Sequence, residues 1–140
     1  MSEKKIGSMD DIREYCMDYY GRVPEAYETM GRYLPDTMMN WIELRKSIFK
    51  NNPGGLTMRE KELISLAIEI TARKPKQQTG AETHAKLAIK NGATVTQISE
   101  VVAICMLLAG MMTYIVSGHT ALKTAEEYNE ELENLKTVPH

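Results

Sequence analysis

His84 lies within a run of alanines and is the residue best suited to acid–base chemistry in this sequence. Histidine can donate or accept a proton near neutral pH because its ordinary pKa lies in that range. The residues three before, one after and four after it are all alanine, which is the spacing of one helix face. That face consists of Ala81, His84, Ala85 and Ala88. We therefore expect the imidazole to point where the apolar stripe points.

Glu69 is the acidic residue that we expect to act together with His84. It lies between Ile68 and Ile70, and a carboxylate buried in such a stretch requires a partner. If the two helices pack antiparallel, Glu69 can orient the imidazole or stabilise its charge. The alternative is a purely structural role, with His84 in the core and Glu69 exposed beside Arg73. The sequence leaves both possibilities open.

Several other side chains are candidates for holding a substrate. Arg73 and Lys76 precede the histidine and could bind the carboxylate of a small acidic molecule, although solvated loop charges are more common. Met112 and Tyr114 are expected to line an apolar pocket, and His119 could face the same cavity. The histidines show no HxxxH or HExxH spacing, so no metal site is expected.

Local signals place these residues on helices. Thr57 with Glu60, and Thr94 with Gln97, have the spacing of a capping box at a helix start. The Asn-Gly pair at 91–92 should end the helix that carries the histidine.

The remaining pattern is helical throughout, with no alternation of period two that would indicate a strand. We expect one all-α domain over residues 1–140, with about six to seven helices. Its parts would be N-terminal helices in 8–50, core helices in 57–116 and a C-terminal helix over 117–135.

The segment Val101–Val116 is strongly apolar and needs a buried environment. It is shorter than the ~20 residues that cross a bilayer and lacks flanking basic anchors, so a membrane span is not expected. A chain of 140 residues cannot easily bury both this segment and the apolar helix that begins after Thr57 within a monomer. We therefore predict a homo-oligomer. Its interfaces would cover parts of the helices that begin after Thr57 and Thr94.

Composition excludes several classes of function. The chain has 17 basic and 19 acidic residues, which argues against nucleic acid and against a polybasic membrane anchor. It lacks GxGxxG, P-loop and GxSxG motifs, so nucleotide and serine-hydrolase chemistry have no support. The two cysteines, Cys16 and Cys105, form no CxxC and, with no apolar signal segment at the N-terminus, indicate a cytoplasmic protein.

The segment THAKLAIKNGATVTQISEVV resembles the core signature of the carboxymuconolactone decarboxylase and alkylhydroperoxidase D superfamily. Upstream, YYGRVPEAYETMGRYLPDTMMNWIELRKSIF and LTMREKELISLAI are similar to the N-terminal region of that superfamily. The resemblance covers nearly the whole chain. It implies an all-α alkylhydroperoxidase D-like fold that forms homo-oligomers, commonly trimers or hexamers.

The peroxidase branch of the superfamily carries a CxxC motif ahead of the histidine. Here Gln77 and Gly80 occupy those places, and the upstream glutamate of the branch falls at about Ser65, with Glu69 one turn later. Without a thiolate there is no nucleophile for a peroxide. Dithiol peroxidase activity is therefore not expected.

The decarboxylase branch also lacks CxxC and keeps the histidine, so His84 matches it. Two features of that branch are missing: an acid where Gly80 stands, and a proline after Gly110. The resemblance implies cofactor-free decarboxylation or isomerisation of a small acidic, lactone-like substrate, with His84 as proton donor. The alternative is a non-catalytic protein of the same fold that binds a small ligand or serves as a subunit of a complex.

Overall fold

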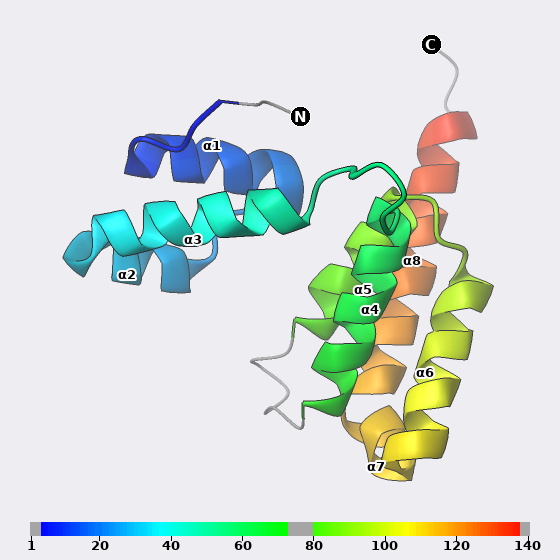
Figure 1. Cartoon of the computed structure of the whole chain (residues 1–140). Coiled ribbons are helices and arrows are strands. Elements are labelled where there is room, and N and C mark those ends of the chain that lie inside the picture. Colours follow the sequence, from blue (N-terminus) through cyan, green and yellow to red (C-terminus); the bar gives the residue numbers. More distant parts are fainter. Residues whose placement is uncertain (1–3, 73–79, 138–140) are drawn as a thin grey trace. The chain divides into compact units, whose positions relative to one another are not determined.

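The computed structural model describes residues 4–72 and 80–137, and every regular element in these ranges is a helix. The prediction of an all-α protein is confirmed (Figure 1). The chain divides into two compact units, Met1–Lys50 and Asn51–His140. A single domain spanning the two stays a prediction, and each unit is described by itself.

The first unit contains three helices, α1 (Met9–Tyr20), α2 (Glu25–Tyr33) and α3 (Pro35–Ile48). Ser8 caps α1 by accepting a hydrogen bond from the backbone of Asp11, and Gly21 ends it with a φ of 74°. A backbone with positive φ is the conformation that glycine adopts at low cost, which is why a glycine suits the end of this helix. The buried core of this unit consists of Ile6, Ile12, Cys16, Met38 and Ile42.

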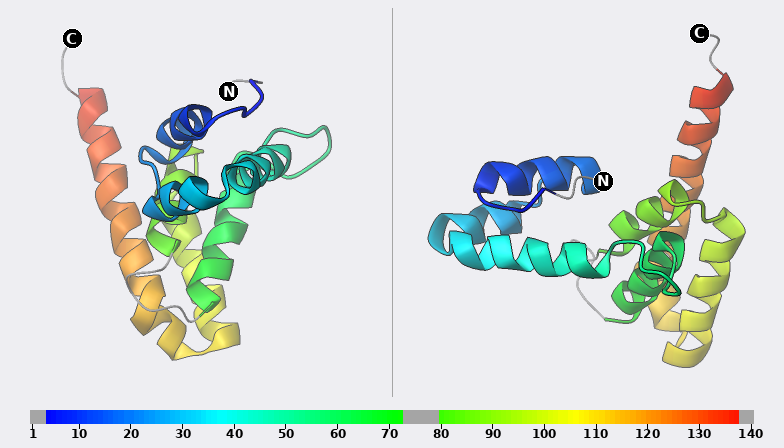
Figure 2. Two further views of the ribbon diagram at one scale, coloured as in Figure 1. Left: turned by 90° about the vertical axis from the view of Figure 1, so that its left-hand side faces the viewer. Right: turned by 45° about the horizontal axis from the view of Figure 1, so that its top comes forward.

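The second unit is a helical bundle that holds the predicted site. Its elements are α4 (Met58–Thr71), α5 (Ala81–Lys90), α6 (Val95–Ala109), α7 (Met111–Thr113), a π-helix (Tyr114–Gly118) and α8 (His119–Thr137). Helix α5 packs against α4 and α8, and α6 also packs against both of these helices. The two views of Figure 2 show α4, α5, α6 and α8 side by side.

Both predicted capping boxes are present. Thr57 and Glu60 satisfy each other's backbone at the start of α4, and Thr94 and Gln97 do so at the start of α6. Helix α5 ends at Lys90, and Gly92 follows with a φ of 96°. The helix that carries His84 therefore ends where its sequence indicated.

Small side chains allow α5 to lie close to its neighbours. Ala81, Ala85 and Ala88 are each at most 1% exposed and belong to the main core cluster of the unit. On α4 the fully buried positions are Glu62, Leu66 and Ile70, spaced four residues apart. One carboxylate thus lies on the buried face of α4.

The apolar run of residues 101–116 is not one continuous helix. Gly110 has a φ of 101° and separates α6 from α7, and the π-helix then leads into α8 at His119 rather than at residue 117. No helix among the described residues has the length and apolarity required to cross a bilayer. A π-helix is uncommon and often occurs at functional sites.

Thr94→Ala should lower the free energy of unfolding by about 1 kcal/mol, because it removes the side chain that caps α6. Urea denaturation followed by circular dichroism measures this loss. Thr96→Ala is the matched control, since Thr96 is an exposed residue of the same first turn whose side chain caps nothing. An equal loss in both variants would contradict a capping role for Thr94.

Candidate active site at the seam of two helices

The centre of the candidate site is a contact between His84 on α5 and Glu62 on α4. Nδ1 of His84 lies 2.7 Å from Oε2 of Glu62. Glu62 has no exposed surface, whereas the side chain of His84 is 17% exposed. The two residues are 22 positions apart in sequence, so only the packing of α4 against α5 brings them together.

The prediction that Glu69 is the partner of His84 is corrected by this geometry. Oε2 of Glu69 accepts a hydrogen bond from the backbone N–H of Gly80, at 3.1 Å. Gly80 is the residue before α5, so the carboxylate lies at the positive end of that helix. The helices run antiparallel, but Glu69 meets the beginning of α5, and Glu62 meets the histidine one turn later along α5.

Sequence reasoning missed Glu62 and chose Glu69, which lies between two isoleucines. The signal for Glu62 is its spacing from Leu66 and Ile70, which places it on the apolar face of α4. The superfamily resemblance put the upstream glutamate at Ser65, three residues later. In the structure the Ser65 hydroxyl donates to the carbonyl of Lys61, and the carboxylate is one turn earlier.

Gly80 occupies the position where the decarboxylase branch was expected to carry an acid, and the structure gives a physical reason for glycine there. A Cβ added at Gly80 would lie 3.0 Å from Cδ and 3.2 Å from Oε1 of Glu69. The carboxylate of Glu69 therefore fills the space that a side chain at residue 80 would need. In this chain α4 supplies an acid to the start of the histidine helix.

The pairing with Glu62 determines what the imidazole can do. An ionised Glu62 accepts a hydrogen bond from Nδ1–H, which fixes the ring orientation and leaves Nε2 as the reactive nitrogen. No described residue forms a hydrogen bond with Nε2. Nε2 can then accept a proton when the ring is neutral, or donate one when the ring is charged. This arrangement suits general acid–base catalysis.

The other predicted site residues do not all reach this centre. Arg73 and Lys76 lie outside the described residues. The rings of Tyr114 and His119 are 5.6 Å apart, and His119 is exposed at the start of α8. Within the described part of the chain, no hydrogen bond or ring contact joins Met112, Tyr114 or His119 to the Glu62–His84 pair.

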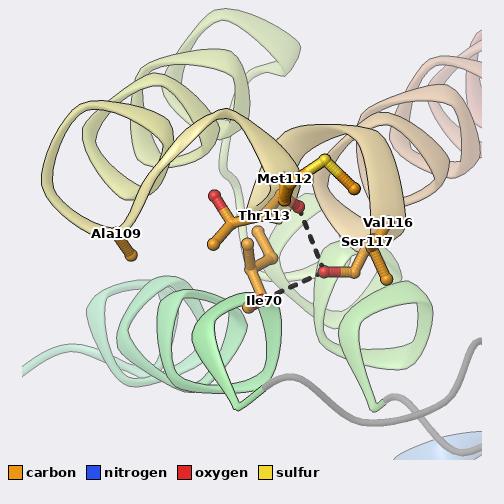
Figure 3. Close-up of a pocket in the computed structure, with 6 residues that line it drawn as sticks. All are labelled: Ile70, Ala109, Met112, Thr113, Val116 and Ser117. Carbon is orange, nitrogen blue, oxygen red and sulfur yellow. Dashed lines mark hydrogen bonds between the residues drawn. The ribbon is translucent and has the colours of Figure 1, made fainter.

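Met112 instead borders a pocket of about 310 Å³. The pocket is lined by Ile70, Ala109, Met112, Thr113, Val116 and Ser117 (Figure 3). The Ser117 hydroxyl reaches the carbonyls of Ile70 and Thr113, at 3.0 and 3.2 Å. The lining is mainly apolar and does not include His84, so the pocket and the pair are separate features.

The two cysteines are free and buried, Cys16 in the first unit and Cys105 on α6. Burial raises the pKa of the Cys16 thiol to about 11, and it also raises the pKa of Cys105. Neither residue is poised as a thiolate near neutral pH. Within residues 4–72 and 80–137, no group of three or more His, Cys, Asp or Glu side chains is placed to hold a metal ion.

Comparison with known proteins identifies the family. Residues 35–117, more than half of the chain, match the model of the carboxymuconolactone decarboxylase family, and the protein belongs to this family. A crystal structure from Burkholderia xenovorans LB400, named as a candidate carboxymuconolactone decarboxylase, has the same fold with a TM-score of 0.80. It is 23% identical, and the match covers 92% of this chain and 96% of that one. No protein of curated function matches the sequence.

Because both thiols are buried with raised pKa values, the folded protein should resist thiol reagents. At pH 8, Ellman's reagent should modify less than one thiol per chain within minutes, and two after unfolding in urea. The unfolded sample is the control for reagent access. Rapid modification of both thiols in the native protein would contradict the burial described here.

Proposed function

We propose that this protein is a cofactor-free decarboxylase or isomerase of a small acidic, lactone-like molecule, with His84 as the proton donor. The observation that carries the proposal is the 2.7 Å contact between Nδ1 of His84 and the fully buried carboxylate of Glu62. Membership of the carboxymuconolactone decarboxylase family supports the substrate class.

The proposed reaction separates into two steps. Cleavage of the bond to the carboxylate releases carbon dioxide, and the bonding electrons pass into the conjugated lactone carbonyl to give a dienolate. Nε2–H of the charged imidazole then delivers its proton to a carbon of the dienolate. The ring regains a proton from solvent, so one substrate and one proton yield product and carbon dioxide.

The role of Glu62 in this scheme is to position the imidazole and to stabilise its positive charge. The buried carboxylate accepts a hydrogen bond from Nδ1–H and leaves Nε2 as the nitrogen that delivers the proton. Glu69 is not a partner of His84, and we assign it to the backbone of Gly80. Arg73 and Lys76 stay proposed anchors for the substrate carboxylate on grounds of sequence alone.

His84→Asn should abolish decarboxylation of 4-carboxymuconolactone, with a loss of kcat of at least about 100-fold, because the proton donor is removed. The loss of ultraviolet absorbance of the substrate measures turnover. Lys86→Ala is the matched control, since Lys86 is exposed on the same helix. Full activity in a folded His84→Asn protein would refute the proposed acid.

Glu62→Gln should lower kcat by about 10-fold or more and leave KM within about twofold, because Glu62 acts on the imidazole and not on the bound substrate. Glu82→Gln, at an exposed position in the first turn of α5, should change neither constant. Thermal unfolding of each variant separates this role from a structural one. A Glu62→Gln protein that loses stability yet keeps full kcat would make the pair structural.

Exposed apolar side chains of the second unit support a further part of the proposal, that the protein forms a homo-oligomer such as a trimer or hexamer. Leu107 and Leu108 on α6 are each 80% exposed. Six further large apolar residues of α4, α6, α7 and the π-helix are each at least 46% exposed: Ile64, Ile68, Ile104, Met111, Met112 and Ile115. A monomer rarely exposes so many to water. A non-catalytic subunit of this fold is the alternative function that the same residues support.

Leu107→Lys should convert the oligomer into smaller species, because a charge introduced into an apolar interface is desolvated without a partner. Light scattering coupled to size-exclusion chromatography measures the mass. Leu135→Lys is the control, since Leu135 is 69% exposed but lies near the end of α8. A monomeric wild-type protein would contradict this part of the proposal.

A further inference from the structure

The start of the histidine helix is held by a second acid, which the proposed reaction does not use. Glu69 of α4 is half-buried, and its Oε2 accepts a hydrogen bond of 3.1 Å from the backbone N–H of Gly80. The carbonyl of Gly80 in turn accepts from the backbone N–H of His84, at 2.9 Å. Gly80 therefore links the carboxylate of Glu69 to the backbone of the histidine one turn later.

The contact between Glu69 and Gly80 is close as well as polar. A Cβ at residue 80 would lie 3.0 Å from Cδ and 3.2 Å from Cγ of Glu69, which is closer than most Cβ contacts in proteins. A side chain at residue 80 would thus displace the carboxylate. The glycine allows α5 to begin directly against the acid of α4.

The position of α5 along α4 requires directional contacts. The buried face beside His84 consists of Ala81, Ala85 and Ala88, each at most 1% exposed. Methyl groups allow two helices to approach closely, but they interdigitate less than larger side chains and oppose sliding only weakly. Hydrogen bonds weaken steeply with distance and angle. The 2.7 Å contact of His84 with Glu62 therefore depends on whatever fixes α5 lengthwise.

We propose that Glu69 is a positioning residue: by holding Gly80 it fixes the axial position of α5 and keeps the ring of His84 within reach of Glu62. The two acids lie on α4 about two turns apart and contact α5 at successive turns, so together they hold it at two points. The role requires no contact between Glu69 and a substrate. Its effect on turnover rests on the proposed function, whereas its effect on the ring does not.

Nitrogen-15 NMR of the imidazole at pH 8, where a free histidine ring is neutral, tests this role without substrate. The signal of His84 is identified by its absence in His84→Asn. The contact with Glu62 should set the ring nitrogens of the folded protein apart from those of the urea-unfolded protein. Glu69→Ala should move them toward the unfolded values by about half of the difference or more, because a shifted ring exchanges between its tautomers.

Two matched variants separate the contact from a general effect of charge. Glu69→Gln keeps an oxygen that can accept from the N–H of Gly80, so it should keep the wild-type ring signals. Glu82→Ala removes an exposed carboxylate from the first turn of α5 and should keep them too. A shift in Glu82→Ala equal to that in Glu69→Ala would reduce the effect to the helix dipole and overturn the proposal.

Gly80→Ala tests the same contact from the other helix, and it serves if Glu69→Ala fails to fold. Its added Cβ should displace the carboxylate and shift the ring signals as Glu69→Ala does. The double variant should shift them no further than either single change, because both changes break one contact. Additive shifts would mean independent effects and would contradict the positioning role.

Turnover gives a second readout. Glu69→Ala should lower kcat for 4-carboxymuconolactone by about 10-fold and leave KM within about twofold, and Glu69→Gln should restore most of the loss. A wild-type protein without turnover would refute the proposed function, and the ring signals would then decide the positioning role alone. Wild-type ring signals in a folded Glu69→Ala protein would overturn that role, even if its Tm were lower.

Discussion

The contact between Glu62 and His84 is the constraint on which the second unit depends. A carboxylate without exposed surface is tolerated only where polar partners satisfy it, and the imidazole on α5 is such a partner. The neighbouring face of α5 carries alanines, so the helix can approach closely enough for a 2.7 Å contact. The carboxylate in turn determines which nitrogen of the ring is left to react. The same pair of residues therefore joins α4 to α5 and orients the imidazole ring.

Sequence reasoning worked for features that are decided within a few residues. The capping boxes at Thr57 and Thr94 and the helix stop at Asn91-Gly92 were predicted because each depends on bonds to the nearest turn. The alanine face around His84 was predicted for a similar reason, since periodicity along one helix shows which side is apolar. The fold class followed from these signals and from the family resemblance.

The partner of the histidine could not be chosen in the same way. Glu62 and Glu69 are seven residues apart, so both lie near the seam with α5, and their assignment depends on the axial offset between the helices. Local pattern does not determine that offset.

The antiparallel pairing of α4 with α5 also bears on how the site assembles. All residues of the Glu62–His84 centre come from a hairpin of two successive helices, so the contacts that build it span short stretches of chain. Contacts of low sequence separation form with little loss of chain entropy and favour rapid folding. The hairpin can thus bring its acid and its histidine together before α8 docks. In this architecture, formation of the Glu62–His84 pair does not require contacts with α8.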